Sequence, residues 1–191
     1  TDKVKRNFPL YWNSGLAQVF ITNYESLKKY FIESISVPEG AKLRLDHIKF
    51  KRDYIGIFNS VIIDESHRVK DSKTQQAKFT KGICAGKPWI LALTGTPVIN
   101  KPKDLISQLS IIEQLAGFGG YQQFVNRYCS GEREASNLRE LNYYLNVRCF
   151  YRRDKQDVLK DLPAKMRQKA LCDINTRKEY QDAERDLVDY L

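Results

Sequence analysis

The stretch Val61-Ile62-Ile63-Asp64-Glu65-Ser66-His67 decides the fold class of this chain. Three apolar β-branched residues end in two adjacent carboxylates. A run that is apolar on both faces is typical of a fully buried central strand in a parallel sheet. Ligands of open α/β sheets bind outside the carboxyl ends of such strands. Two carboxylates at that edge, one holding a metal ion and one handling a proton, suit nucleotide hydrolysis.

A second stretch of the same design, Leu91-Ala92-Leu93-Thr94-Gly95-Thr96-Pro97, follows thirty residues later. Its apolar run also ends in a polar turn, and Asp71-Ser72 predicts the N-cap of a helix between the two stretches. Strands that alternate with helices indicate an α/β fold, with a parallel sheet and covering helices. The predicted order is strand 19–24, helix 25–35, strand 61–65, helix 73–84 and strand 89–93.

The chain changes character after Pro102, where the apolar spacing becomes helical. Residues 150–170 form a basic connector that Pro163 breaks. We therefore expect an α/β part over 1–102, a helical part over 103–149, and a connector and helix over 150–191. The predicted helices cover about 103–115, 120–129, 136–146 and 175–190. The helical spacing places most aromatic residues of this region in a core: Tyr121, Phe124, Tyr128, Tyr143 and Tyr144.

Residues 37–58 have no assigned role. The segment 41–58 is charged and fits a short strand or a loop edge, with apolar residues Leu43, Leu45, Ile48 and Phe50. The sequence alone leaves these two alternatives open.

The composition is that of a globular protein, with 42% hydrophobic and 29% charged residues among 191. No apolar run approaches the roughly 20 residues of a membrane span, and no signal peptide is visible. Because the chain begins at Thr1 without a clear cap, we expect a piece of a longer protein. The net charge of +9 indicates a polyanionic partner such as nucleic acid, or a basic surface that binds nothing.

The cysteines form no clip of the C-x-x-C type, and the two histidines, His47 and His67, lie far from them in sequence. This spacing indicates neither a zinc site nor a disulfide framework. A reducing intracellular compartment follows, which is the cytoplasm or nucleoid of a bacterium or the nucleus of a eukaryote. The cysteines are Cys84, Cys129, Cys149 and Cys172.

Several stretches resemble motifs of superfamily-two helicase-like ATPases. Asp64-Glu65-Ser66-His67 resembles the second motif, the DEAH-like box, and Leu93-Thr94-Gly95-Thr96-Pro97-Val98-Ile99-Asn100 resembles the third motif of the Swi/Snf family. Ile21-Thr22-Asn23-Tyr24-Glu25 resembles motif Ib. A later segment is similar to the signature that follows the first lobe of these enzymes. Its matching residues are Arg152, Arg153, Lys155, Asp157 and Val158, followed by Leu162, Pro163 and Lys165. These motifs occur in the family's order over about residues 16–180.

The resemblance implies the later part of a first RecA-like lobe, followed by a Swi/Snf-type helical insertion. Arg127-Tyr128-Cys129 and Ser136-Asn137-Leu138-Arg139-Glu140-Leu141 further resemble segments of the HepA-related, annealing-helicase branch. A phosphate-binding loop is missing from the sequence. The segment Gly82 to Lys87 is one residue too short, has Pro88 in place of Ser or Thr, and follows a helix. In the family that loop precedes all of these motifs, and the second lobe follows them.

The resemblance gives the residues of the two turns distinct roles. Asp64 is expected to hold Mg²⁺ through water, and Glu65 to orient and deprotonate the water that attacks the γ-phosphate of ATP. His67 would link the nucleotide site to the third motif. Thr94 and Thr96 supply hydroxyls there, and Gly95 permits a tight turn. The alternatives are an acidic pair that caps a turn, a packing histidine, and a turn without coupling.

The same resemblance implies contacts to the backbone of double-stranded DNA. Thr22, Asn23 and Tyr24 match a DNA-contacting segment, although a capped helix start explains them nearly as well. Arg68 and Lys70 either contact phosphate or form a solvated face. The connector residues, which either set the geometry between lobes or are ordinary surface, are Arg152, Arg153 and Lys155.

The function that the resemblance implies is a double-stranded-DNA-dependent ATPase and translocase that remodels DNA-bound protein. The chain by itself would be inactive, because nucleotide affinity depends on the backbone donors of the missing loop. The alternative is a DNA-binding or protein-docking module that has lost its ATPase. An RNA-directed enzyme of the same superfamily fits less well, because the third motif here reads Leu-Thr-Gly-Thr-Pro and not Ser-Ala-Thr. No base-reading motif is visible, so DNA binding should be salt-sensitive.

Overall fold

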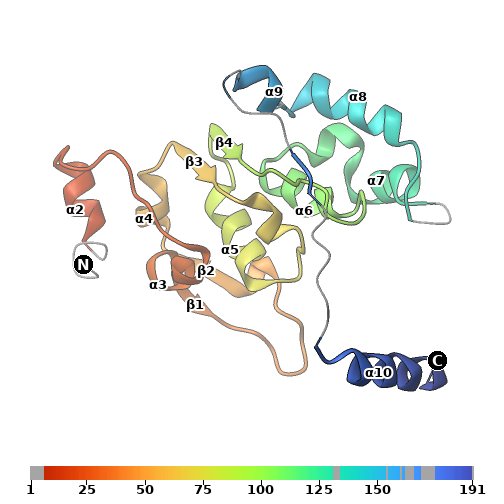
Figure 1. Cartoon of the computed structure of the whole chain (residues 1–191). Helices are drawn as coiled ribbons and strands as arrows, with labels where there is room; N and C mark the ends of the chain where they lie inside the picture. The colour runs from red at the N-terminus through yellow and green to blue at the C-terminus, as the bar shows by residue number, and fades with distance from the viewer. Residues whose placement is uncertain are drawn as a thin grey trace. The chain divides into compact units, whose positions relative to one another are not determined.

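The computed structural model describes residues 7–130, 134–153, 155–159, 161, 166–168 and 175–190 (Figure 1). The chain divides into two units, residues 1–150 and 151–191, and each is described here by itself. The described elements of the first unit are α2 (Phe8–Asn13), η1 (Tyr24–Ser26), α3 (Leu27–Phe31), β1 (Ile32–Ile35), η2 (Leu45–His47), β2 (Ile48–Phe50), α4 (Arg52–Gly56), β3 (Ser60–Ile63), η3 (Ser66–Val69), α5 (Gln75–Cys84), β4 (Trp89–Ala92), α6 (Asp104–Ile111), η4 (Leu115–Phe118), α7 (Gly120–Tyr128) and α8 (Leu138–Arg148).

The two apolar runs form the parallel strands β3 and β4, as the sequence predicts. Ser60 pairs with Trp89, and the register continues to Ile63 opposite Ala92. Helix α5 connects the strands, with Thr74 as its N-cap: the Thr74 hydroxyl accepts a hydrogen bond from the Ala77 N–H at 3.2 Å. The cap lies slightly after the predicted Asp71-Ser72, but the strand, helix, strand order of this segment is confirmed.

The prediction that these strands are buried on both faces is wrong. One face packs on a cluster of Ile63, Val69, Ala77, Cys84 and Ile111. On the other face, Ile62 is 66% exposed, Trp89 71% and Leu91 54%. The physical reason is that the described sheet has only these two strands, and α5 and α6 cover one side of it.

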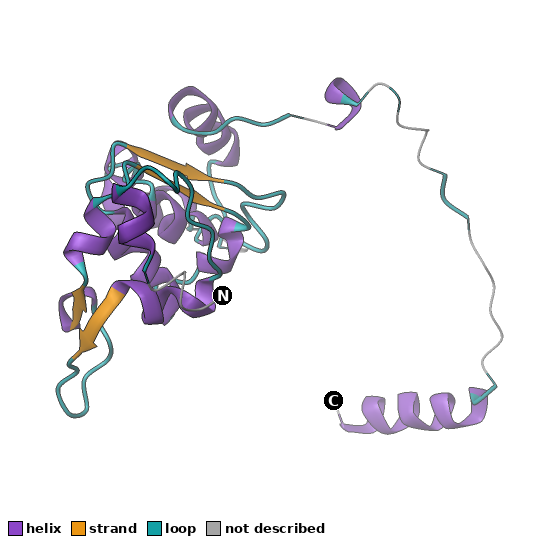
Figure 2. Ribbon diagram, turned by 90° about the vertical axis from the view of Figure 1, so that its left-hand side faces the viewer, coloured by secondary structure: helices purple, strands orange, loops and turns teal. Residues whose placement is uncertain are grey.

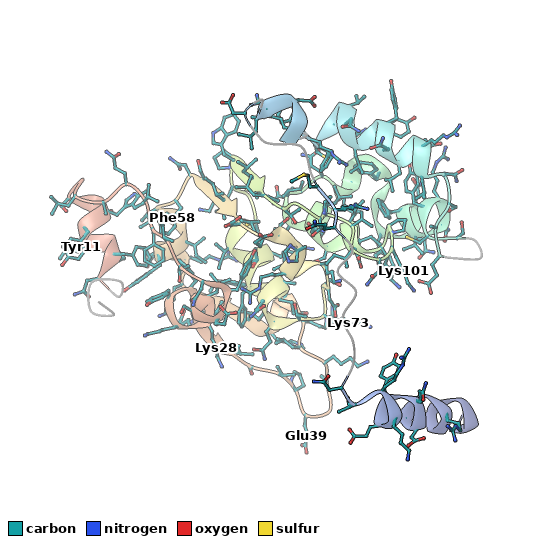
Figure 3. All side chains as sticks on the ribbon, viewed as in Figure 1. Tyr11, Lys28, Glu39, Phe58, Lys73 and Lys101 are labelled. Carbon is teal, nitrogen blue, oxygen red and sulfur yellow. The ribbon has the colours of Figure 1, made fainter. Side chains whose placement is uncertain are left out.

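A second pair of strands, β1 and β2, is antiparallel and separate from the first pair (Figure 2). The predicted helix over 25–35 therefore ends early, at Phe31. The apolar residues Ile32 and Ile35 fit a helical period, but they pair instead with Phe50 and Ile48 of β2. Tertiary pairing of β-branched residues overrides the local period here. Figure 3 shows Glu39 at the tip of the loop that joins the two strands.

The predicted strand over 19–24 is also wrong. These residues are a loop that leads into η1, and Asn23 keeps an extended backbone with φ −96° and ψ 164°. Phe20 packs on Phe8, with ring centroids 4.4 Å apart, while Val19 and Ile21 are exposed. The side chains alternate as in a strand, but no described strand pairs with this segment.

Helix α5 lies between two hydrophobic clusters. Phe79 and Ile83 face a cluster that is rich in aromatic rings and includes Phe8, Phe31 and Phe50. Gly82 allows the close approach of the Phe50 ring, since a Cβ atom at position 82 would lie 2.0 Å from it. The other side of α5 contributes Ala77 and Cys84 to the cluster under β3.

The helical part agrees with the predicted elements within a few residues, except that the first helix ends at Ile111. Glu113 has a left-handed backbone, with φ +60°, which a continuing helix does not allow. Of the aromatic residues predicted in the core, Phe124 and Tyr128 are buried. The prediction is wrong for Tyr121, Tyr143 and Tyr144, which are exposed at 54%, 64% and 37%.

The second unit contains two described helices, α9 (Lys155–Val158) and α10 (Arg177–Tyr190). Helix α10 matches the helix predicted over 175–190. Helix α9 lies in the predicted basic connector. The signature residues Leu162, Pro163 and Lys165, together with Cys172, lie outside the described residues.

Candidate functional site

The polar turns that follow β3 and β4 lie side by side. The Leu93 N–H donates to the Ile63 carbonyl at 2.8 Å, and the Ser66 N–H donates to the Leu93 carbonyl at 2.9 Å. These bonds continue the parallel ladder past the ends of the strands. The structure therefore brings together the two motifs that the sequence places thirty residues apart.

The acidic pair forms a strained turn directly after β3. Glu65 has the left-handed values φ 48° and ψ 51°, a conformation that costs a non-glycine residue about 1–2 kcal/mol. The Glu65 N–H donates to the Asp64 carboxylate at 3.0 Å. The second carboxylate oxygen of Asp64 has no partner among the described residues, so it is available to a cation. A carboxylate oxygen suits Mg²⁺, which prefers oxygen ligands and retains several waters.

His67 joins the acidic turn to the turn after β4. Its Nδ1 atom lies 3.1 Å from a carboxylate oxygen of Glu65 and 3.1 Å from the Thr94 hydroxyl. The contact with Glu65 is an ion pair when the imidazole is protonated, and the tautomer of the ring decides whether Nδ1 donates to or accepts from Thr94. One imidazole nitrogen therefore faces both predicted motifs.

The turn after β4 is held by Thr94. Its hydroxyl accepts a hydrogen bond from the Thr96 N–H at 3.1 Å in addition to its contact with His67. Gly95 does not have a positive φ, and a Cβ atom added there would meet nothing within 4 Å. The described conformation of the turn thus does not itself require glycine, and the coupling role of Gly95 and Thr96 stays a prediction.

Tyr24 reaches across to the acidic turn. Its hydroxyl donates to the Asp64 carbonyl at 2.7 Å, and burial raises the pKa of this phenol to about 12 although Arg68 opposes the shift. Arg68 also lies over the Tyr24 ring, 5.1 Å from its centroid, and forms an ion pair with Glu25 at 2.5 Å. Through these contacts, Tyr24 and Arg68 help to hold the segment 24–25 next to the acidic turn.

Of the other predicted DNA-contacting residues, Asn23 and Lys70 also have contacts within the chain. The Asn23 side chain caps η1 by accepting from the Ser26 N–H at 3.1 Å, which is the alternative role noted for this segment. The Thr22 hydroxyl is buried and has no partner in the described part of the chain. Lys70 lies 4.0 Å from an Asp104 carboxylate oxygen. These contacts do not test whether the residues bind DNA, so their DNA-contacting role stays a prediction.

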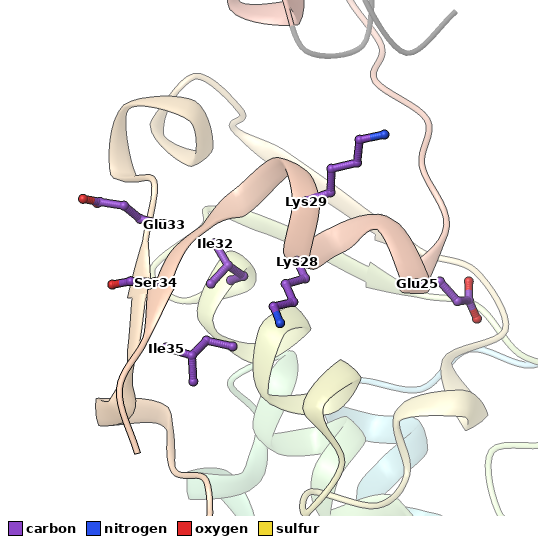
Figure 4. Close-up of a pocket in the computed structure, with 7 residues that line it drawn as sticks. All are labelled: Glu25, Lys28, Lys29, Ile32, Glu33, Ser34 and Ile35. Atoms are coloured by element: carbon purple, nitrogen blue, oxygen red, sulfur yellow. The ribbon is translucent and has the colours of Figure 1, made fainter. Parts of the chain in front are cut away.

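A shallow hollow of about 530 Å³ is lined by residues of the segment 25–35 (Figure 4). Its charged lining mixes Lys28 and Lys29 with the carboxylates of Glu25 and Glu33. Glu33 is further paired with Lys49, at 2.7 Å. Since both signs of charge are present, the hollow is not a uniformly positive phosphate groove. Its remaining lining residues are Ile32, Ser34 and Ile35.

The connector residues belong to the second unit. The Arg153 Nε donates to the Tyr151 hydroxyl at 2.8 Å, and Arg152 is exposed. Lys155 has its backbone in α9, and its side chain is outside what the structure describes. The role of these residues in setting the geometry between lobes is untested and stays a prediction.

The two segments noted for their resemblance to the HepA-related branch meet in space. Arg127 of α7 binds both carboxylate oxygens of Glu140 in α8 at 2.6 Å, and the Tyr128 hydroxyl donates to the same carboxylate at 2.7 Å. Ser136 and Asn137 donate from their side chains to the Arg127 carbonyl. Hydrogen bonds from Arg127 and then Tyr128 lower the pKa of Glu140 to about 2.

The contacts of Arg127 and Tyr128 with the Glu140 carboxylate predict that the stability of the chain depends on pH. A carboxyl group whose folded pKa is lowered stabilises the fold above its unfolded value, and this stabilisation disappears as pH falls through the folded value. We therefore expect Glu140→Gln to lower the urea midpoint of the chain at pH 7. The difference from the unaltered chain should shrink as pH falls from about 4.5 towards 2. Urea titrations of both chains at pH 7, 5 and 3 measure it, and a constant difference would contradict the assignment.

Sequence reasoning missed two buried polar residues of α6, of which Gln108 alone contacts both turns. Gln108 and Ser107 of α6 are 6% and 4% exposed, and both form hydrogen bonds to η3. The available signal was a polar residue at an apolar position of the predicted helix, because Gln108 follows Leu105 by three residues and precedes Leu109. The Tyr24 contact to Asp64 had no sequence signal.

A parallel strand pair whose adjacent turns carry an acidic pair, a bridging histidine and a Thr-Gly-Thr turn is what the motif resemblance predicts for the helicase-like ATPase class. Comparison with known families agrees, since the model of the SNF2-related domain matches residues 13–186. The chain therefore belongs to the SNF2-related, or Swi/Snf-type, family.

Curated relatives carry this segment within much longer proteins. The chain is 33% identical over 143 residues to a Caenorhabditis elegans homolog of "SWI/SNF-related matrix-associated actin-dependent regulator of chromatin subfamily A-like protein 1", covering 71% of this chain and 20% of the relative. The Drosophila melanogaster protein of that name is 32% identical, covering 61% and 16%. The mouse "DNA annealing helicase and endonuclease ZRANB3" is 33% identical, covering 61% and 12%. The chain thus matches a fifth or less of each relative's length.

No solved structure gives a significant match to this chain. Among the described residues, no helix has the length and apolar character needed to cross a membrane.

Proposed function

We propose that this chain is part of a double-stranded-DNA-dependent ATPase and translocase. The observation that carries the proposal is the His67 bridge, which places one imidazole 3.1 Å from both Glu65 and Thr94. A link of this kind would pass a change at the nucleotide to the neighbouring turn. The family membership and the names of the relatives, which include chromatin regulators and an annealing helicase, support action on DNA.

The chemistry follows from the acidic turn. Mg²⁺, when bound with ATP, would neutralise charge that develops on the phosphates. Asp64 would hold the ion, because it presents a carboxylate oxygen at the end of β3. Glu65 would orient the attacking water and accept its proton. The 3.1 Å contact with His67 would orient this carboxylate. Thr94, Gly95 and Thr96 would then couple hydrolysis to movement along DNA.

The chain does not carry the whole catalytic apparatus in this proposal. Residues 1–102 would be the later part of the first RecA-like lobe, 103–149 the helical insertion, and 150–191 the connector towards a second lobe. The phosphate-binding loop would lie elsewhere in a longer protein, so the chain alone would not turn over ATP. Arg152, Arg153 and Lys155 would set the geometry between the lobes.

DNA binding in this proposal is dominated by the backbone of the duplex. The net charge of +9 favours a polyanion, and Thr22, Asn23, Tyr24, Arg68 and Lys70 are the proposed contacts. The ion pair of Arg68 with Glu25 leaves its remaining N–H groups to serve a phosphate. The protein would be intracellular, and nuclear in a eukaryote. It would belong to the annealing-helicase branch of the family, and a DNA-bound protein would be a further partner.

The test is ATP hydrolysis by the proposed longer protein, with and without double-stranded DNA. Turnover that DNA stimulates would establish the motor. The salt dependence of DNA binding, measured in parallel, should be steep because each neutralised phosphate releases counterions. DNA binding without turnover would refute the ATPase and leave a binding module, with the helical part and the positive charge as its working elements.

A further inference from the structure

Gln108 makes a second connection between the two turns, separate from the His67 bridge. Its Oε1 accepts a hydrogen bond from the Ser66 hydroxyl at 2.9 Å. Its Nε2 donates to the Pro97 carbonyl at 2.7 Å and to the Asp104 carbonyl, one turn back in α6, at 3.0 Å. Since carbonyl oxygens only accept, the two Nε2 contacts fix the orientation of the amide.

The Ser66 end of this connection is buried and its Pro97 end is partly buried, whereas the His67 side chain is 30% exposed. Ser66 and Gln108 are exposed by only 1% and 6%. A buried polar group that loses its partner is costly, so neither the Ser66 hydroxyl nor the Pro97 carbonyl separates readily from the amide. The two turns therefore share one satisfied network beneath the surface, on the core side of the site.

The N-terminal end of α6 holds the same turn by a further contact. The Asp104 carboxylate accepts hydrogen bonds from the N–H groups of Ile99 and Asn100, at 3.2 and 3.0 Å. A displacement of the segment 97–100 must therefore move α6 or break these bonds. Through Gln108, a movement of α6 reaches Ser66, the residue that follows Glu65.

We propose that Gln108 is a positioning residue that transmits the state of the Thr94–Pro97 turn to the acidic turn. This inference rests on the proposed ATPase function. It adds to the His67 link a path from the partly buried Pro97 carbonyl through the Gln108 amide to the buried Ser66 hydroxyl. The amide is suited to this task because it accepts on the Ser66 side and donates on the Pro97 side.

The test compares Gln108→Met with Ser107→Ala in the proposed longer protein. Methionine keeps the length of the side chain and removes all three hydrogen bonds. Ser107 is the matched control: it is buried in the same helix and donates to the Val69 carbonyl of η3 at 2.6 Å, but within the described part of the chain it forms no hydrogen bond to the turn after β4. The readout is the ratio of DNA-stimulated to basal ATP turnover.

We expect Gln108→Met to lower this ratio by about 5–150-fold, the usual range of coupling between two sites, and Ser107→Ala to leave it unchanged. Ser66→Ala should lower the ratio similarly, and the double variant should add little, because both changes break one path. A purely structural role would reduce basal and stimulated turnover together. A ratio unchanged in Gln108→Met, with turnover intact in the unaltered protein, overturns the inference alone. No turnover in the unaltered protein overturns the proposed function as well.

Discussion

Glu65→Gln should lower ATP turnover of the proposed longer protein by about 10²–10⁴-fold, the usual contribution of a general base. The amide has almost the same shape as the carboxylate and can keep the 3.1 Å contact with His67 Nδ1. It cannot take a proton from the attacking water. Nucleotide binding should persist, because Asp64, the proposed Mg²⁺ ligand, is unaltered. Turnover and nucleotide affinity are measured on the same preparation.

Glu113→Gln is the matched control for this substitution. Glu113 is also a glutamate with a left-handed backbone, at φ +60°. It lies after the C-terminal end of α6, away from the two turns, and accepts a hydrogen bond from the Gly86 N–H. The amide oxygen of glutamine can accept the same bond, so turnover should not change. Normal turnover in Glu65→Gln would refute the assigned base. Equal loss in both variants would point to a general effect on folding.

Phe124→Ala should destabilise the chain by about 3–5 kcal/mol, as large-to-small changes in tight cores do. Phe124 is 0% exposed. It packs between Phe118 and Tyr128, with ring centroids 6.0 and 5.1 Å away. Because domains are stable by only about 5–15 kcal/mol, this single change should remove a large share of the stability. Urea denaturation of the 191-residue chain measures it.

The control is Tyr121→Ala in the same helix. Tyr121 is 54% exposed, and substitutions at exposed positions usually change stability by less than about 0.5 kcal/mol. Similar losses in both variants would show that exposure does not distinguish the two rings, and that the helical cluster is not a tight core.

The sequence predicts well those elements whose patterns are local. The runs 61–65 and 89–93 become β3 and β4 in parallel register, because each combines β-branched or large apolar residues with a polar turn. It fails where long-range pairing decides the result. Ile32 and Ile35 fit a helix until β2 is available to pair with them. Residues 19–24 resemble a strand, but none of the described strands pairs with them.

The candidate site follows the same division. Glu65, His67 and Thr94 are motif residues, and the structure places His67 Nδ1 3.1 Å from each of the other two. Gln108 has no motif, and only its position between Leu105 and Leu109 sets it apart. The exposed outer face of β3 and β4 could not be predicted either, because an apolar run does not state how many strands surround it.

The left-handed backbone of Glu65 has a consequence for mutagenesis and natural variation. Glycine adopts this conformation without steric cost, so folding alone favours glycine over glutamate at position 65. A library selected only for thermal tolerance would therefore drift towards variants that have lost the carboxylate. Selection for ATP turnover would act against that drift and keep glutamate at position 65. Lineages that no longer need the activity should lose this glutamate early.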